Sequence, residues 1–474
     1  MCFMTTTKTV EEYRTEKDTM GDIKVPSWAY WGAQTQRAVD NFPISNLRFS
    51  KDFIRALALI KLAAAKANIE LGLLDEKKGN AIISAAKEVM EGSLYDHFVV
   101  DVFQTGSGTS TNMNMNEVLA NRAIELLGGK RGQKGLIHPN DDVNLGQSTN
   151  DVFPSAIHVA AAESVTRKLS PALHVLAKSL ESKAREFEDF VKAGRTHLQD
   201  AVPVTLGQEF GGYASMIRHG IRRAERARDV LLELPLGGSA VGTGLNTHPK
   251  YTELAIREIN RLTGLEFRKA ENTFEAMQGK DEAVEASGLL KTIAVSLMKI
   301  ANDLRLLASG PRTGFAEIEI PAAQPGSSAM PGKVNPVIPE AVNLVAAQVI
   351  GNDTAITTCG AFGQLELNIM MPVIAYNLLE SIEILSSSTK LLGEKCVNGI
   401  TADKTRLLDY AEKSLALVTA VAPAIGYDNA AKIAKKAVAE NKPVRQAILE
   451  EKLLPKEKLD HVLNLKRMTK GGRE

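Results

Sequence analysis

The segment KDEAVEASGLLKTIAVSLMKIANDLRLLASG, which spans residues 280–310, is the clearest indication of the fold. It holds few helix breakers, and its apolar residues recur at steps of three and four, the spacing of one face of an α-helix. The residues on this face are Leu290, Ile293, Leu297, Ala301, Leu304 and Ala308. Apolar residues on other faces are Leu289, Val295, Ile300 and Leu307. A helix that is apolar on several sides is buried on several sides, and about thirty helical residues span about 45 Å. The sequence therefore predicts a central bundle of long helices that other subunits bury further.

Two more long segments, 163–194 and 363–399, carry comparable helical patterns, each with one proline that we expect to kink the helix. The first fifty residues show no sustained period and are predicted to be irregular, with helical patterning from about Asp52. In AIGYDNAAKIAKKA (residues 424–437), a loop precedes an amphipathic helix. We predict a mainly α protein with an N-terminal domain (1–149), a central long-helix domain (150–400) and a small helical C-terminal domain (401–474).

Composition excludes several classes of partner. Among 474 residues, Lys and Arg number 57 and Asp and Glu 56, so the net charge is +1 and no nucleic-acid or membrane partner is predicted. No run of about 18 apolar residues indicates a membrane span. The cysteines, Cys2, Cys359 and Cys396, form no CxxC, which argues against a disulfide framework or zinc site. The first twelve residues lack a signal-peptide pattern, so we expect a cytoplasmic protein.

Polar, glycine-rich loops separate the helical segments. They are TGSGTS (105–110), HPNDDVNLGQSTND (138–151), GRTHLQD (194–200), LGGSAVGTGLNTHP (236–249) and GSSAMPGKVNP (326–336). Their hydroxyls and amides, with the charge of Lys333, suit a small, oxygen-rich anion. No Walker A, GxGxxG or HExxH pattern supports nucleotide or zinc chemistry. A plainer reading is that such loops are turns, and that Ser148, Asn150 and Asp151 cap the next helix.

GSSAMPGKVNP resembles the signature GSSxMPxKxN of the fumarase/aspartase superfamily. The other loops match in the family's order, and GSGTSTNMNMNEVLANRA, HPNDDVN, GRTHLQDAVPVTLGQE and GGSAVGTGLN look like class II fumarases. The resemblance covers nearly the whole chain. It implies a three-domain fumarase/aspartase-like fold and a homotetramer with a 20-helix core. It also implies active sites shared between three subunits, and neither cofactor nor metal.

The resemblance favours a fumarase over an aspartase. Ser107, His138 and Ser239 stand where aspartases usually read otherwise, with GAGTS, no histidine and GAT. Thr149, which replaces the serine usual in fumarases, and KVNPVIPEAV have an aspartase character, so aspartate ammonia-lyase is the alternative. A non-catalytic crystallin-like or anion-binding protein is the alternative of another class.

The implied reaction is the reversible dehydration of L-malate to fumarate, a step of the citric acid cycle, through an aci-carboxylate intermediate. By resemblance, Ser327 is the base, and Lys333 and Asn335 stabilise the charge. His197 activates or protonates the departing water, and Glu340 pairs with His197. The residues implied to bind substrate are Ser107, Gly108, Thr109, Ser148, Thr149, Asn150, Thr196, Ser328, Lys333, Val334 and Asn335. A second anion site is implied at His138, Pro139, Asn140 and Asp141.

Overall fold

The computed structural model describes residues 12–472 and is built mainly from α-helices, as the sequence predicts. Within this range no helix is long and apolar enough to cross a membrane. Cys359 and Cys396 are buried and free. Cys2 and nearly all of the segment in which no leader is expected lie outside the described residues.

Helices make up most of the described chain. They are α1 (Ala33–Asn41), α2 (Lys51–Glu70), α3 (Glu76–Met90), α4 (Thr109–Leu126), α5 (Thr149–Ser164), α6 (Ser170–Glu186), α7 (Leu206–Val230), α8 (Tyr251–Thr263), α9 (Thr273–Gln278), α10 (Asp281–Leu307), α11 (Val337–Gly360), α12 (Met371–Leu391), α13 (Lys404–Lys413), α14 (Val418–Ile425), α15 (Tyr427–Ala439), α16 (Val444–Glu450), α17 (Lys456–Val462) and α18 (Leu465–Met468).

The strands pair only two by two among the described residues. The antiparallel pairs are β1 (Tyr13–Asp18) with β2 (Gly21–Pro26), β3 (Val191–Thr196) with β4 (Gln199–Thr205), β7 (Ile318–Glu319) with β10 (Thr401–Ala402), and β8 (Gly363–Gln364) with β9 (Leu367–Asn368). The parallel pair is β5 (Glu233–Leu234) with β6 (Arg268–Lys269).

The described chain divides into two compact units. Unit 1 contains residues 12–170, 223–292 and 348–385, and unit 2 contains residues 171–222, 293–347 and 386–472. The helices α7, α10, α11 and α12 each contribute residues to both units.

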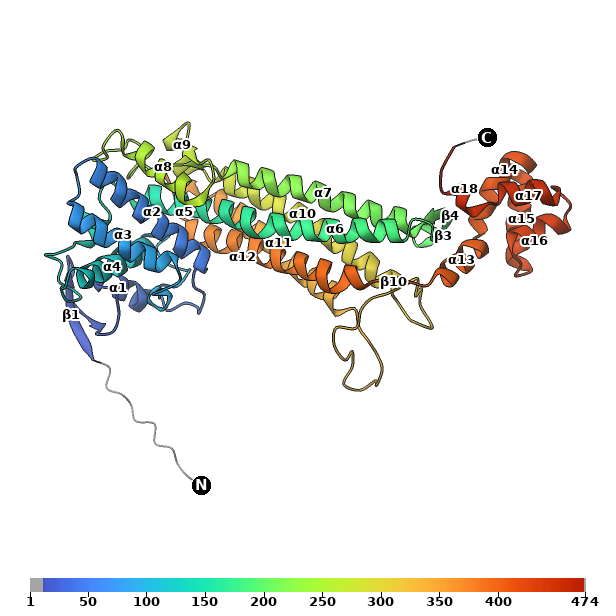
Figure 1. Cartoon of the computed structure of the whole chain (residues 1–474), viewed down its shortest axis with the longest axis horizontal. Coiled ribbons are helices and arrows are strands. Elements are labelled where there is room, and N and C mark those ends of the chain that lie inside the picture. Colours follow the sequence, from blue (N-terminus) through green and yellow to red (C-terminus); the bar gives the residue numbers. More distant parts are fainter. Residues whose placement is uncertain (1–11, 473–474) are drawn as a thin grey trace, which may run out of the picture. The chain divides into compact units, whose positions relative to one another are not determined.

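Helix α2 lies at the centre of unit 1. It packs against α3, α5 and α8, and Figure 1 shows α2, α3, α4 and α5 side by side. Ser50 caps its first turn by accepting the N–H of Phe53. The helix begins at Lys51, which confirms the start predicted near Asp52. Most of its residues are buried, because its many alanines let neighbouring helices approach on several sides.

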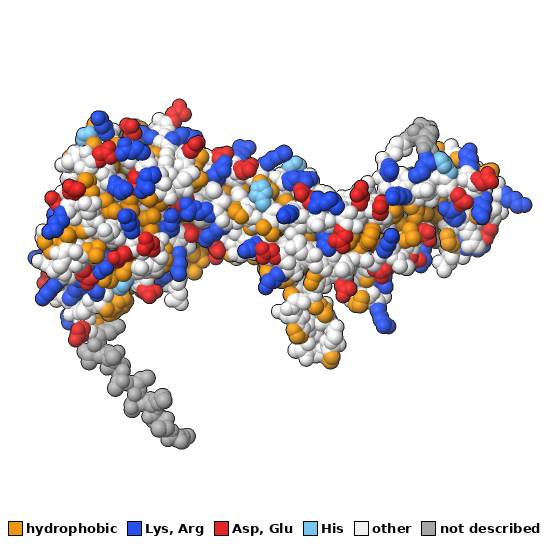
Figure 2. Space-filling view, viewed as in Figure 1, with side chains coloured by type: hydrophobic (Ala, Val, Ile, Leu, Met, Phe, Trp, Pro, Cys, Tyr) orange, Lys and Arg blue, Asp and Glu red, His pale blue; other side chains and the backbone are white. Residues whose placement is uncertain are grey.

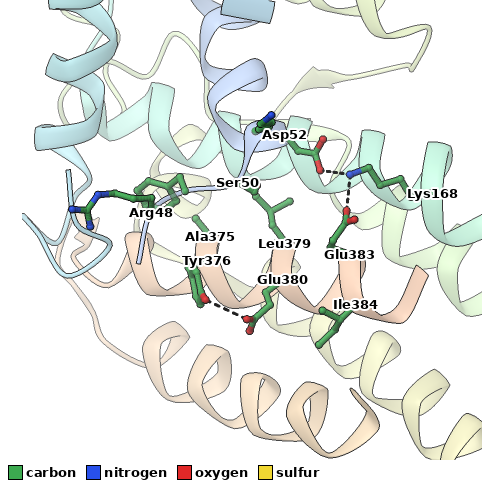
Figure 3. Close-up of a pocket in the computed structure, with 12 residues that line it drawn as sticks. Arg48, Ser50, Asp52, Lys168, Ala375, Tyr376, Leu379, Glu380, Glu383 and Ile384 are labelled. Carbon is green, nitrogen blue, oxygen red and sulfur yellow. Dashed lines mark hydrogen bonds and ion pairs between the residues drawn. The ribbon is translucent and has the colours of Figure 1, made fainter. Parts of the chain in front are cut away.

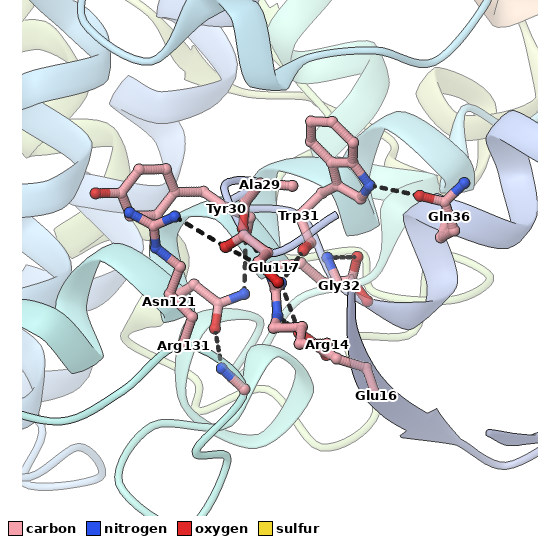
Figure 4. Close-up of polar contacts among 12 residues, drawn as sticks. Arg14, Glu16, Ala29, Tyr30, Trp31, Gly32, Gln36, Glu117, Asn121 and Arg131 are labelled. Carbon is pink, nitrogen blue, oxygen red and sulfur yellow. Dashed lines mark hydrogen bonds and ion pairs between the residues drawn. The ribbon is translucent and has the colours of Figure 1, made fainter. Parts of the chain in front are cut away.

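The expectation that the first fifty residues are irregular is wrong over residues 13–41, and residues 1–11 lie outside the described chain. Strands β1 and β2 form an antiparallel hairpin, and α1 follows. The Arg14 guanidinium organises this segment by donating to the carbonyls of Pro26, Ala29 and Trp31 over 2.9, 2.7 and 2.6 Å (Figure 4). This order arises from side-chain hydrogen bonds to the backbone, which leave no periodic pattern in the sequence.

Glu117 of α4 holds the start of α1. Its carboxylate accepts the N–H groups of Gly32, Gln34 and Thr35 over 2.8, 2.9 and 3.1 Å. A carboxylate at a helix N-terminus satisfies N–H groups that have no partner within the helix. Burial raises the pKa of Glu117, and these hydrogen bonds oppose that shift. The partners are 82 to 85 residues apart, so local sequence could not predict the contact.

Helix α10 confirms the segment that predicted the fold. Its predicted inner face is buried at Leu290, Ile293, Leu297, Ala301 and Leu304. On the other faces Ile300 and Leu307 are buried, whereas Val295 is 51% exposed in the single chain.

The two prolines behave differently. Pro171 has no N–H group and so cannot make the i to i−4 hydrogen bond of an α-helix. Just before it, the helix widens into a π-helical turn at Val165–Leu169, where the missing hydrogen bond is tolerated. The expectation that Pro372 kinks a helix is wrong. Residues 363–368 form the β8–β9 hairpin, and Pro372 lies in the first turn of α12, where no intrahelical N–H partner is needed.

The C-terminal helices of unit 2 have an apolar cluster of their own. It includes Leu417, Val421, Ile433, Ala437, Val444, Ala447, Ile448 and Leu459. Helix α15 follows Gly426, and its apolar face buries Ile433 and Ala437, which confirms the amphipathic helix predicted there. Figure 2 shows basic and acidic side chains interspersed on the visible face, with neither sign gathered into one large patch.

Candidate active site

Unit 1 brings two of the predicted polar loops together at neighbouring helix N-termini. Ser107 and Thr109 lie at the start of α4, and Thr149 is the first residue of α5. The Asn112 amide Nδ2 donates to Thr149 Oγ1 over 3.0 Å and joins the two ends. The first N–H groups of a helix and its dipole favour an anion. Two such ends side by side are suited to a carboxylate.

Gly108 makes this close approach possible. Its φ is +83°, and an added Cβ would lie 2.2 Å from the ring of Phe153 on α5. Only glycine fits that space and that backbone conformation. On either side of it, the hydroxyls of Ser107 and Thr109 are 2.8 Å apart.

The start of α5 is also capped, as the plainer reading of this loop proposed. Ser148 Oγ accepts the N–H of Asn150 over 3.3 Å, and Asp151 accepts the N–H of Ser148 over 2.9 Å. The second oxygen of Asp151 accepts the N–H groups of Gly237 and Ser239 over 2.9 and 3.1 Å. Burial raises the pKa of Asp151 to about 6. The polar loop at 236–249 is thereby attached to the loop that carries Thr149.

A buried network behind Thr149 was missed by the sequence analysis. Lys61 of α2 donates to Asn144 Oδ1 over 2.9 Å and to Gln147 Oε1 over 3.0 Å. Asn112 and Asn116 also donate to Asn144 Oδ1, over 3.2 and 3.1 Å. Burial lowers the pKa of Lys61 to about 7. The sequence feature that could have indicated this network is a lysine inside the apolar run LALIKLAAA (residues 57–65).

The residues of the predicted second anion site form one tight turn. His138 Nδ1 accepts the N–H groups of Asn140 and Asp141 over 3.3 and 3.2 Å, at the start of the π-helical turn Pro139–Val143. The side chains of Asn140 and Asp141 are exposed. Because the imidazole is used to cap this turn, His138 positions the backbone of the loop.

In unit 2, His197 lies at the tip of a β-hairpin. Thr196 ends β3, and His197 and Leu198 form the connection to β4 with φ of 57° and 59°. Positive φ at two successive residues that are not glycine is uncommon, and such conformations cluster at functional sites. Thr196 and His197 are exposed.

Buried charges support this hairpin. Arg195 Nη2 donates to Glu317 Oε1 over 2.7 Å, and Lys192 Nζ lies 3.1 Å from the other Glu317 oxygen. Lys192 also lies 3.2 Å from Glu209. The Arg195 guanidinium stacks 4.2 Å from the centre of the Phe315 ring. Charge pairs of this kind hold β3 firmly against the segment around residue 317.

The loop GSSAMPGKVNP places two backbone donors on Ser327. Its Oγ accepts the N–H groups of Ala329 and Met330 over 3.1 and 2.9 Å. The Asn335 amide donates to the carbonyl of Gly326 over 2.5 Å and closes the loop. Donors aimed at a hydroxyl oxygen stabilise negative charge there, which favours ionisation of the hydroxyl.

Of the remaining predicted residues of unit 2, Ser328, Lys333 and Val334 belong to this loop, and Glu340 follows it in sequence. An added Cβ on Gly326 would lie 2.1 Å from the Lys333 carbonyl, so this glycine permits the loop to close. Ser328, Lys333 and Val334 are exposed, and Glu340 lies in the first turn of α11. No hydrogen bond or ion pair joins Glu340 to His197 among residues 12–472 of this single chain.

Two cavities in unit 1 contain none of the predicted site residues. The larger has a volume of about 380 Å³ and lies between the start of α2 and α12 (Figure 3). Lys168 lies at its edge, 2.7 Å from Asp52 and 2.6 Å from Glu383. The other, of about 340 Å³, is lined by residues between 39 and 48 with Val99 and Asp101.

Comparison with known proteins places the chain in a family. Residues 21–351 match the Lyase family, and residues 417–470 match the Fumarase C C-terminus family. The class II fumarate hydratase of Nitrosomonas europaea is 53% identical over 460 residues, covering 97% of this chain and 100% of that protein. The mitochondrial fumarate hydratase of Rhizopus oryzae is 50% identical, covering 97% of this chain and 93% of that protein. The recombinant class II fumarase of Schistosoma mansoni is 40% identical, with a TM-score of 0.94 over 97% of this chain and 99% of that one. The chain belongs to the class II fumarate hydratase family.

Proposed function

We propose that this protein is a fumarate hydratase that interconverts L-malate and fumarate. The observation that carries the proposal is 53% identity to a class II fumarate hydratase over 97% of this chain and the full length of that relative. Every candidate catalytic residue is also present, and the two helix N-termini joined by Asn112 and Thr149 suit one carboxylate of a dicarboxylate.

In the proposed mechanism, Ser327 removes a proton from the carbon next to a carboxylate of L-malate. A serine hydroxyl is a weak base and needs its oxyanion stabilised. The N–H groups of Ala329 and Met330 support this assignment, because both already point at Ser327 Oγ. The bonding electrons move into the adjacent carboxylate and give an aci-carboxylate, whose two negative charges Lys333 and Asn335 stabilise.

The second half of the reaction expels the hydroxyl group. We assign to His197 the proton that converts this hydroxyl group to water, and we assign to Glu340 the orientation of the imidazole. We propose that the Glu340 and the His197 of this pair come from different subunits. The hydroxyls and amides of the two loops in unit 1 and Thr196 bind the carboxylates.

We further propose the homotetramer with shared sites and the three domains 1–149, 150–400 and 401–474. Exposed apolar side chains on the long helices support further burial by other subunits, with Val295 and Leu344 51% and 74% exposed. The second anion site at His138–Asp141 is proposed as accessory. The low number of cysteines supports a cytoplasmic location.

One assay tests the function. Purified protein is given L-malate, then L-aspartate, then fumarate with ammonia, while fumarate absorbance is followed. We expect fumarate to form from L-malate alone. Release of fumarate from L-aspartate, or ammonia-dependent loss of fumarate, would identify an aspartate ammonia-lyase. Binding of dicarboxylate without turnover would identify an anion-binding or crystallin-like protein.

A further inference from the structure

We propose that Lys61 is a positioning residue for the reaction. Through Asn144 and Asn112, it determines the direction in which the Thr149 hydroxyl donates its proton. This inference rests on the proposed function, because Thr149 is one of the proposed carboxylate-binding groups.

The first step sets the orientation of Asn144. An asparagine side chain carries an oxygen that accepts and a nitrogen that donates, and either can occupy a given position. Lys61 supplies only N–H donors, and it lies 2.9 Å from Asn144 and 3.0 Å from Gln147. Both partner atoms must therefore be oxygens. The amine keeps two N–H bonds when it loses its proton, so both contacts survive in either charge state.

The second step passes this direction to Asn112. The Asn144 oxygen can only accept, so the atom of Asn112 that lies 3.2 Å away is its NH₂ group. The same NH₂ group donates to Thr149 Oγ1 over 3.0 Å. Thr149 thus accepts from the protein, and its own O–H remains free to donate. A substrate carboxylate has only acceptors, so a hydroxyl oriented in this way is complementary to it.

Burial makes the direction strict. Lys61 and Asn116 are 0% exposed, Asn112 is 1% exposed and Thr149 is 8% exposed. Water cannot replace a lost partner here, and hydrogen bonds polarise one another in such surroundings. Burial of Lys61 is itself unfavourable, as its lowered pKa of about 7 indicates, with only the charge of Asp151 opposing the shift. A costly buried group that is joined to a binding loop is a candidate for a functional role.

The test removes the N–H donors of Lys61 and keeps a side chain of similar size. In Lys61→Met we expect kcat/KM for L-malate to fall about tenfold or more, because a misaligned binding group is costly. Lys280→Met is the matched control. Lys280 is a buried lysine of the same unit, and within residues 12–472 it donates only to the backbone carbonyls of residues 276, 277 and 279. The kcat/KM of Lys280→Met, measured per folded protein, should differ from the wild-type value by less than about twofold.

A double-mutant cycle separates positioning from general structural support. If Lys61 acts through the Thr149 hydroxyl, Lys61→Met should have less than about a twofold effect once Thr149→Val has removed that hydroxyl. A merely structural role predicts that the two effects multiply. Asn112→Asp serves if Lys61→Met does not fold. It puts an acceptor against Thr149 Oγ1 with almost no change in shape, turns the hydroxyl inward, and should lower kcat/KM by about the same factor.

The outcomes also separate this inference from the proposed function. If wild-type protein converts L-malate and Lys61→Met does so equally well, the positioning role is wrong and the function stands. If wild-type protein is stabilised thermally by L-malate without converting it, the proposed reaction is wrong. Loss of that stabilisation in Lys61→Met would then still support the role of Lys61. Wild-type protein that neither binds nor converts L-malate contradicts both.

Discussion

Arg195 donates to Glu317 over 2.7 Å, and the Glu317 carboxylate is completely buried between Arg195 and Lys192. This pair joins the hairpin that carries His197 to the chain just before β7. A buried carboxylate with two cationic partners is costly to remove, because the cations are then left without compensation.

Glu317→Gln should therefore destabilise the protein by about 3 kcal/mol and lower kcat through displacement of His197. Thermal or denaturant unfolding and the L-malate assay measure the two effects. Glu285→Gln is the matched control, because it breaks the exposed pair Arg226–Glu285 at 2.6 Å and should cost less than about 1 kcal/mol. Equal stability of the two variants would contradict the assigned anchoring role.

Ser327→Ala should lower kcat by about 10²-fold or more, since it removes the proposed base. Ser328→Ala is the control, because Ser328 is assigned only to binding and is an exposed residue. Both variants should retain the wild-type melting temperature, as the loop is largely exposed. Near-normal turnover by Ser327→Ala, or a larger loss in Ser328→Ala, would assign the base elsewhere.

The stability of the protein should depend on pH through Lys61. Its pKa is about 7 in the folded chain and about 10.4 when unfolded, so between these values the unfolded chain binds more protons. Stability from this group therefore rises with pH, by at most about 1.4 kcal/mol per pH unit. The melting temperature of wild type relative to Lys61→Met should increase from pH 7 to pH 9. A constant difference would show that Lys61 does not titrate in this range.

Asp151 should give the stability of the protein the opposite pH dependence, in a lower pH range. Its pKa is about 6 in the folded chain and about 3.9 when unfolded, so the folded chain binds more protons between them. The contribution of this group to stability therefore falls as pH rises from about 4 to about 6. Asp151→Asn should remove this dependence, which melting curves at pH 4.5 and 6 would detect. An unchanged slope would mean that other groups dominate.

Glu117→Ala should release the start of α1. Three backbone N–H groups would lose their acceptor, and we expect a loss of about 2 to 4 kcal/mol in the free energy of unfolding. Limited proteolysis should cut the region of residues 12–41 sooner than in wild type. Glu117→Gln keeps one acceptor oxygen, so its stability and protease resistance should lie between those of wild type and Glu117→Ala. If Glu117→Ala resists the protease as well as wild type does, Glu117 does not hold the start of α1.

Local sequence determined the helices and the loops that separate them. The spacing of Leu290, Ile293 and Leu297 is enough to place one face of α10 in the core, because helical period and burial are properties of neighbouring residues. The motif GSSAMPGKVNP likewise identified the family without coordinates, since its residue types and spacing are carried by one short stretch.

Only the tertiary structure decided which distant groups meet. Glu117 organises residues 32–35, and Lys61 reaches Asn144 across 83 positions. Neither contact leaves a periodic trace, because a hydrogen bond requires only two atoms at the right place and places no constraint on the residues between them. The sequence alone thus established the helical fold and the family. The direction of the hydrogen bonds behind Thr149 depends on long-range packing, which brings a buried lysine to the back of a binding loop.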